Sequence, residues 1–424
     1  MFFKDSFRVA WIGATAFQVV LLCACKQETS LIPPSQFLQT KSGLPGAKPN
    51  STPTSTPTPG PSLGPVFVPK IDASCMAPGN DYEACIFFKN PVYERKAPFA
   101  TTIGQTSDLS QYQTYGVKIA NRDTSGFLQN ATFRVIPPNT ISRLAADAAG
   151  KFKVPFSNCS APGVCTADSS RRVSQVMAYY WLDAQEQMMK ARTGKFYASG
   201  KNILVNTYQT NFDNAAWDAL NNRVLMGVSG TQDYALSAEV YSHEMGHANL
   251  DYATNFVIFN SDVSGTEVVC AQGLATCCKT VAGCIDAINE GQADYHAAIV
   301  FDEGGTLGET LINTLGGIVE CGLGRSIVGN KNLVAATAFA ACGNIGGGEI
   351  HVTGRVYASI WWEVRNLATS SAIEVDKLFS EHLPALSASD TFSSTLNKIK
   401  AIDMALFAGK YSAAFTAEFA RRGL

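Results

Sequence analysis

The residues of this chain best suited to chemistry lie in one short stretch, His243-Glu244-Met245-Gly246-His247. The pattern H-E-x-x-H places two histidines at i and i+4, so both imidazoles leave one face of a helix and can bind the same metal ion. The glutamate lies beside that face, where it can take a proton from a metal-bound water. The stretch therefore predicts a helix that holds a hydrolytic zinc ion.

A catalytic zinc site normally has three protein ligands and a fourth position open to water. The metzincin pattern would supply the third ligand as a histidine shortly after His247, but Ala253 occupies that position and Leu250 replaces the required glycine. Glu290 and Asp294 offer a better partner, because carboxylates at i and i+4 leave one face of a second helix. One of them can bind the metal while the other accepts the far N–H of a ligating histidine and fixes its tautomer.

The order of these motifs resembles the gluzincin metallopeptidases, particularly the thermolysin-like and fungalysin-like enzymes. H-E-x-x-H is followed by N-E-x-x-A-D at residues 289–294. Further segments match that family in the same order: an N-A-x-W edge-strand segment at 214–217, a segment similar to the fungalysin H-x-x-G-x-x-x-A…L-W-E-V at 351–364, and a terminal F-A-x-R-G-L at 419–424. The resemblance runs from about Arg172 to Leu424.

The resemblance implies a zinc endopeptidase. In it, His243, His247 and Glu290 bind one Zn²⁺ per chain. Glu244 acts as general base and then as acid to the leaving amine, and Asp294 orients His243. Independently of the family, zinc lowers the pKa of a bound water toward about 7 and polarises a carbonyl, which makes hydrolysis feasible at neutral pH.

The resemblance also implies contacts to a peptide or protein substrate. His351 would donate a hydrogen bond to the developing oxyanion, and Asn214 with the backbone of Ala215 would pair with the peptide as an added strand. One departure concerns His351: the carboxylate that helps this histidine in thermolysin-like enzymes would fall at Gly346, although Glu349 lies close by.

Two histidines stand outside these motifs. His296 is about 240° around the helix from Glu290, so it is expected to point away from the metal and to be structural. His382 is expected on the surface of an amphipathic C-terminal helix.

The elements that must position the site predict an α+β protein. Short β-like runs such as 115–120 and 131–136 are followed by helical spacing over Arg172 to Arg192, then by strands at Ile203–Tyr208 and Arg223–Gly227, and from Leu236 onward the pattern is mainly helical. We expect a two-lobed gluzincin fold: a β-containing N-terminal lobe, a mostly helical C-terminal lobe, and the zinc helix in the cleft between them. The expected units are a lipoprotein signal peptide (1–25), a Pro/Ser/Thr-rich linker (26–70) and a β-rich N-terminal region (71–170). The catalytic N-lobe with the zinc helix (171–250) and the helical catalytic C-lobe (251–424) follow.

The first 25 residues are typical of an export signal. Lys4 and Arg8 precede or flank a short apolar run, which ends at Leu22-Cys23-Ala24-Cys25. That ending resembles the bacterial lipobox, whose last cysteine is acylated, so Cys25 is the expected lipidation site and the outer membrane or cell surface the expected location. The alternative is an ordinary cleavable signal and a secreted or periplasmic protein. Residues 26–70 hold a Pro/Ser/Thr-rich tract that suits a tether, or a stiff spacer without an anchor.

Cysteines beyond the signal are even in number, which in an exported chain favours disulfides. Local spacing suggests Cys75 with Cys85, Cys159 with Cys165, and Cys321 with Cys342. The cluster 270–284 could form two more disulfides in the loop between the metal-bearing helices. A second metal site there is the alternative, although the cluster lacks a C-x-x-C pair.

Composition bounds the partners. A net charge of −2 with 16% charged residues gives no basic patch, so nucleic acid is not an expected partner. We expect the protein to contact the membrane only through the lipid anchor and to act as a monomer. Calcium binding is possible, but no sequence motif supports it. The rival function is a non-catalytic lipoprotein that keeps a peptidase fold as a binding or scaffolding module. A disulfide-held domain with a closed, structural zinc is a third possibility.

Overall fold

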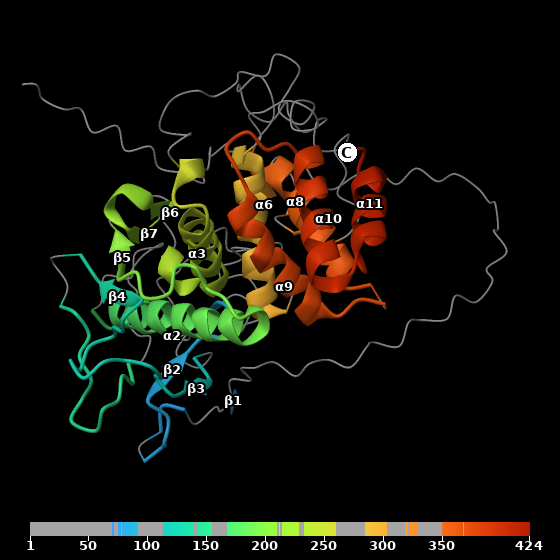
Figure 1. Cartoon of the computed structure of the whole chain (residues 1–424). Coiled ribbons are helices and arrows are strands. Elements are labelled where there is room, and N and C mark those ends of the chain that lie inside the picture. Colours follow the sequence, from blue (N-terminus) through green and yellow to red (C-terminus); the bar gives the residue numbers. More distant parts are fainter. Residues whose placement is uncertain are drawn as a thin grey trace, which may run out of the picture.

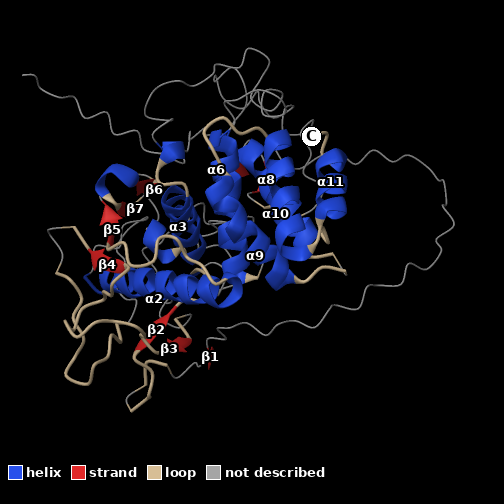
Figure 2. Ribbon diagram, viewed as in Figure 1, coloured by secondary structure: helices blue, strands red, loops and turns tan. Residues whose placement is uncertain are grey.

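The computed structural model describes residues 70–71, 75–77, 79–91, 113–138, 142–154, 168–209, 212, 214–228, 233–259, 285–302, 319–320, 323–324, 326–328, 350–367 and 369–424. Most of the strands lie toward one side of the described structure, and most of the helices lie toward the other (Figure 2). The protein is thus α+β, with a strand-containing lobe and a helical lobe, as the sequence predicts.

The main sheet has the strand order β4-β5-β7-β6. Strands β4 (Phe133–Ile136), β5 (Ile203–Gln209) and β7 (Arg223–Gly227) run parallel, and β6 (Ala215–Asp218) runs antiparallel to β7 at one edge. The β-branched and apolar residues of β5 and β7 suit a sheet covered by helices. Helix α2 (Asp168–Thr193) contacts β4 and β5, and helix α3 (Ala238–Ala253) contacts β6 and β7.

A small antiparallel sheet lies beside α2, with the order β1-β3-β2. It consists of β1 (Lys70–Ile71), β2 (Ala84–Ile86) and β3 (Tyr115–Val117), so the β-like run expected over 115–120 is shorter than predicted. A disulfide joins Cys75 to Cys85, which confirms the first of the pairings expected from spacing.

The helical lobe contains α6 (Ile285–Phe301), α8 (Ile350–Arg365), α9 (Ala372–His382), α10 (Phe392–Phe407) and α11 (Ser412–Arg421). The long helix α2 runs from the sheet to α9 and so spans both lobes (Figure 1). After α6, strands β8 (Val319–Glu320) and β9 (Leu323–Gly324) pair antiparallel.

The core of the helical lobe surrounds Trp361, which packs against Phe379, Phe415 and His382. The expectation that His382 lies on the surface is wrong, since its side chain is fully buried and lies 3.0 Å from the Tyr357 hydroxyl. Burial lowers the pKa of His382 to about 3, so the ring is neutral and acts as a hydrogen-bonding core residue.

Several predictions fall outside the described residues: the export signal with Cys25, the tether, and the cysteines at 159, 165, 270–284, 321 and 342.

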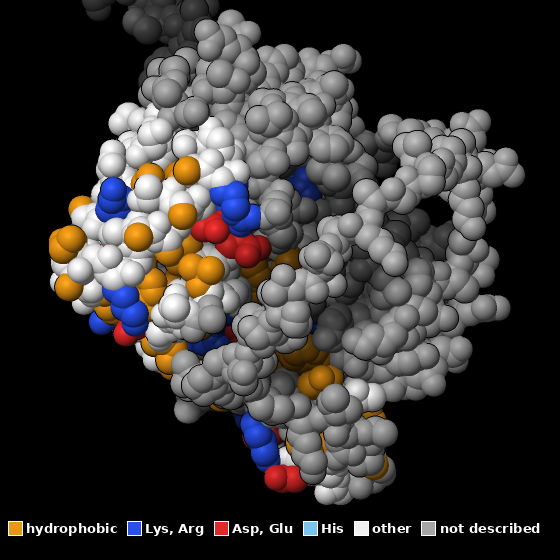
Figure 3. Space-filling view, turned by 90° about the vertical axis from the view of Figure 1, so that its right-hand side faces the viewer, with side chains coloured by type: hydrophobic (Ala, Val, Ile, Leu, Met, Phe, Trp, Pro, Cys, Tyr) orange, Lys and Arg blue, Asp and Glu red, His pale blue; other side chains and the backbone are white. Residues whose placement is uncertain are grey.

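In the part of the chain that the structure describes, no helix is both long and apolar enough to cross a membrane. On the face shown in Figure 3, the hydrophobic side chains of the described residues are scattered, with small groups of Lys, Arg, Asp and Glu between them.

Candidate metal centre

Helix α3 carries the H-E-x-x-H stretch and is buried along nearly its whole length. Ser237 precedes it in an extended conformation, and Asn255, with a left-handed φ of 52°, follows its end. Polar side chains occur on a helix that has no solvent-facing side, so each of them needs a partner inside the protein. The partners of its two histidines come from α6.

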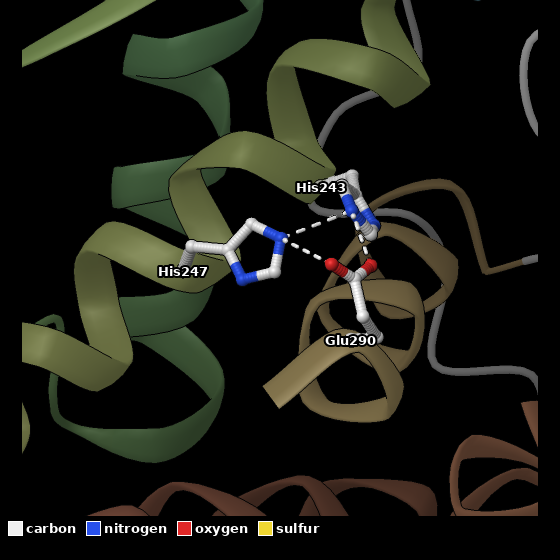
Figure 4. Close-up of side chains that lie close together, drawn as sticks. All are labelled: His243, His247 and Glu290. Atoms are coloured by element: carbon white, nitrogen blue, oxygen red, sulfur yellow. Dashed lines mark hydrogen bonds and ion pairs between the residues drawn. The ribbon is translucent and has the colours of Figure 1, made fainter. Parts of the chain in front are cut away.

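Three donor atoms from the two helices converge (Figure 4). The Nε2 atoms of His243 and His247 lie 3.1 Å apart, and Glu290 places Oε2 at 3.3 Å from the first and Oε1 at 3.7 Å from the second. In a tetrahedral zinc site with bonds of about 2.0–2.1 Å, donor atoms are separated by about 3.3 Å. The spacings between the two nitrogens and the carboxylate are therefore close to the edge lengths of a zinc tetrahedron.

The far nitrogens of both histidines face oxygen acceptors. His243 Nδ1 lies 2.9 Å from the Asp294 carboxylate, and His247 Nδ1 lies 2.8 Å from Asn289 Oδ1. An acceptor at Nδ1 favours the tautomer with its proton there, so each ring, when neutral, presents its Nε2 lone pair to the other ring and to a carboxylate. Such a group of electron-rich atoms repels itself unless a cation lies among them, so the donor set fits zinc. Asn289 holds His247 in the way that Asp294 holds His243.

The Glu290 carboxyl is fully enclosed. Burial alone would raise its pKa, but positive charge on the His351, His247 and His243 rings, when these are protonated, outweighs burial and holds the pKa of Glu290 well below its ordinary value. The group is therefore an ionised carboxylate at neutral pH, as a metal ligand must be.

Glycines let the metal-bearing helices approach closely. A Cβ added at Gly246 would lie 2.7 Å from the Cα of Ala293, so α3 and α6 touch at their backbones beside the ligands. A Cβ at Gly291 would lie 2.5 Å from the Gly354 carbonyl oxygen, so α6 and α8 do the same. Real Cβ atoms do not approach other atoms this closely, so only glycine fits these positions.

Helix α8 brings His351 to the site. Its Nε2 lies 3.4 Å from Glu290 Oε2. Among the described residues, the group whose ligand atoms all lie within 4.8 Å of one another consists of His243, His247 and Glu290, and does not include His351. The arrangement is that of three ligands with a histidine beside them rather than of a closed four-ligand site. Glu244 is buried in the same turn of α3.

The edge strand β6 lies against the end of α3. Asn214 immediately precedes β6, and its Oδ1 accepts a hydrogen bond from the Ala215 N–H at 2.9 Å. The Trp217 indole donates to the Asp251 carboxylate at 2.7 Å, which ties the strand to the metal-bearing helix one turn after His247. Burial raises the pKa of Asp251 to about 7, although the Trp217 bond lowers it.

His296 has the structural surroundings expected for it. Its Nδ1 lies 2.6 Å from Gln185 Nε2, which also donates to the Ser242 carbonyl at 3.1 Å. Burial lowers the pKa of His296 to about 4, so the ring is neutral. Helices α2, α3 and α6 are tied together at this point.

Comparisons with known proteins find likenesses among solved structures. No family model and no curated protein matches the chain. Among solved structures, the precursor of protealysin, a metalloproteinase from Serratia proteamaculans, is similar with a TM-score of 0.47 and 12% identity, covering 72% of this chain and 91% of that chain. At this identity the likeness concerns the fold alone.

Proposed function

We propose that the protein is a zinc-dependent endopeptidase of the gluzincin type. The observation that carries the proposal is the meeting of His243, His247 and Glu290 at spacings of 3.1 to 3.7 Å, with the far nitrogens of both histidines held by oxygen acceptors. Bound there, zinc would supply a Lewis acid for the scissile carbonyl and a water of lowered pKa.

In the proposed mechanism, Glu244 takes the proton of the attacking water and passes it to the leaving amine. Its place next to His243 in α3 favours this role. His351 donates a hydrogen bond to the oxyanion that develops on the substrate carbonyl, which its approach to Glu290 at 3.4 Å supports.

The substrate proposed is an extended peptide. Among the described strands, β6 pairs with β7 on one side and is the edge of the sheet on the other, with its side chains buried. An edge strand can accept a further strand through its backbone groups. Asn214 and Ala215 stand at the start of this edge, and the Trp217–Asp251 bond fixes the strand relative to the metal centre. We infer that the peptide backbone pairs here.

Two variants test the proposal. Glu244→Gln removes the base without removing a ligand, so the full chain should keep about one zinc and lose cleavage of an unstructured protein such as casein. Glu186→Gln is the matched control, because Glu186 is a buried carboxylate on α2. It accepts hydrogen bonds from the Thr132 and Ser199 hydroxyls and lies outside the metal centre. Cleavage by Glu244→Gln at the parental rate would refute the mechanism.

The rival is a binding module that keeps the fold without catalysis. Retention of Glu244 beside a complete set of ligands favours the enzyme, since a module of that kind has no need of the base. Zinc binding without cleavage of any unstructured protein by the parent would favour the module.

The proposed location is a bacterial membrane, reached through a lipid on Cys25. The lipobox-like ending of the signal supports it. Cys25→Ser should release the protein from the membrane fraction, and unchanged fractionation would count against lipidation.

A further inference from the structure

Helix α3 does not cap its own N-terminus. The first N–H groups of a helix have no partner within it and need one from outside. Ser237 occupies the N-cap position but makes no side-chain bond to the first turn. Instead the Ala238 N–H donates to the Lys89 carbonyl at 2.7 Å. A residue far away in the sequence therefore serves as the cap.

The next residue adds a second tie. Asn90 Nδ2 donates to the Glu239 carboxylate at 2.6 Å, across 149 residues of sequence. Both side chains are fully buried. A buried carboxylate depends on its hydrogen bonds, because a buried charge that loses a partner is strongly destabilising. Lys89 itself has a left-handed φ of 61°, which a residue with a side chain keeps only when its surroundings fix it.

The segment that carries these ties, residues 84–91, also reaches the other helices of the site; we call it the capping segment. The Phe88 ring packs edge-on against Trp181 of α2 and Phe301 at the end of α6. The Trp181 indole donates to the Phe87 carbonyl at 3.3 Å. The capping segment therefore contacts α2 and both helices that carry the metal ligands.

The geometry gives these contacts a consequence for the metal centre. Glu239 and His243 are at i and i+4, so they lie on one face of α3, one turn apart. A change in the direction of the first turn is passed through the helical hydrogen bonds to His243. Zinc–ligand distances normally lie within about 0.2 Å of their usual values, so a shift of His243 disturbs the site.

We propose that the capping segment is a permanent part of the catalytic unit, in which Asn90 and Glu239 are positioning residues for the metal-bearing helix, and that it is not a prosegment removed on activation. The inference rests on the proposed function. It requires that any cleavage that matures the protein leave residues 84–91 in place.

The test compares two full-chain variants. Asn90→Ala removes the tie to α3. Asn121→Gly removes a tie of the same chemistry from an exposed side chain, an amide bonded to the Asp183 carboxylate of α2 at 2.9 Å, and glycine suits the φ of 56° at that position. Zinc affinity by chelator competition, kcat and KM for casein, and hydrogen exchange of α3 are measured well below the unfolding temperature.

Asn90→Ala should bind zinc about 10-fold or more weaker, a range typical of groups that orient ligands, with faster exchange in residues 238–247 and a fall in kcat rather than a rise in KM. Asn121→Gly should change none of these. Glu239→Gln, which keeps an oxygen acceptor for Asn90, should retain most of the parental zinc affinity. Equal zinc affinity in Asn90→Ala and Asn121→Gly would overturn the inference.

Mass analysis of the active parental species gives an independent result. The species that cleaves casein should contain residues 84–91, and a fully active species that begins after residue 91 would overturn the inference. If the parent binds zinc but cleaves nothing, the proposed function fails, while the zinc affinities and exchange rates still decide whether the segment positions α3.

Discussion

Two glycine-to-alanine substitutions should separate metal binding from catalysis. Gly246→Ala places a methyl group between α3 and α6, the two helices that carry the ligands. Gly291→Ala places the same methyl group between α6 and α8, the helix that carries His351. The two variants share their chemistry and differ only in which pair of helices they push apart.

The distances give the size of the effect. The new Cβ would lie 2.7 Å from the Cα of Ala293 in Gly246→Ala and 2.5 Å from the Gly354 carbonyl oxygen in Gly291→Ala. An ordinary contact needs about 3.5 Å between carbons and about 3.3 Å between carbon and oxygen, so each pair of helices must separate by roughly 0.8 Å. Overpacking of this kind costs about 1–3 kcal/mol, against a gain of about 1 kcal/mol in helix propensity.

Gly246→Ala should therefore lower zinc affinity, by about 10- to 100-fold, because this displacement exceeds the usual spread of about 0.2 Å in zinc–ligand distances. Gly291→Ala should keep its zinc and lose activity, by about 100-fold for a displacement near 1 Å. Chelator competition and casein cleavage measure the two effects, and thermal unfolding gives the stability. If both variants are more stable than the parent and unchanged in zinc binding and cleavage, the close helix contacts are absent and the reasoning fails.

Other predictions concern single side chains. Asn289→Ala should weaken zinc binding about 10- to 100-fold by releasing His247, as measured by chelator competition; parental affinity would contradict the role of Asn289. Burial raises the pKa of Asp251 to about 7, so the folded protein holds a proton that the unfolded chain releases, and stability should fall by about 2–3 kcal/mol from this group between pH 5 and pH 8. In Asp251→Asn, urea unfolding should show a smaller fall in the free energy of unfolding between pH 5 and pH 8. A fall as large as in the parent would refute the assignment. Cys75→Ala with Cys85→Ala opens a short loop and should lower the free energy of unfolding by roughly 3 kcal/mol in the chain-entropy account; a loss below about 1 kcal/mol would show that native contacts already hold the loop.

The sequence could predict the members of the metal cluster because helical periodicity is local. His243 with His247, and Glu290 with Asp294, are pairs at i and i+4, so each pair shares a face wherever its helix lies. The strands at 203–209 and 223–227 could also be predicted from the sequence, since their β-branched and apolar content identifies buried strands.

The contacts between elements could not be predicted in the same way. Asn289 is next to Glu290 in sequence, and only the crossing of α3 and α6 turns it toward His247. A signal existed in Gly246 and Gly291, since glycine inside a helix is costly and often marks a close contact. The amphipathic pattern around His382 did not reveal that Trp361 and Tyr357 cover it.

The tie from Asn90 to Glu239 had no local signal at all. It joins residues 149 apart in the sequence, and an Asn-Pro pair after a short apolar run favours a turn rather than a cap for a distant helix. The sequence even points the other way, because Ser237 is a favoured N-cap residue, and the structure alone shows that its side chain makes no bond to the first turn.

The central claim is that two imidazoles and one carboxylate hold a single zinc ion and leave a position open. X-ray absorption at the zinc edge, or anomalous diffraction from crystals of the zinc-loaded protein, tests it most directly. We expect His243 Nε2, His247 Nε2 and a Glu290 oxygen within about 2.3 Å of the ion, with a water as the remaining ligand. Sulfur ligands, four protein ligands, or a Glu290 carboxylate distant from the ion would contradict the account.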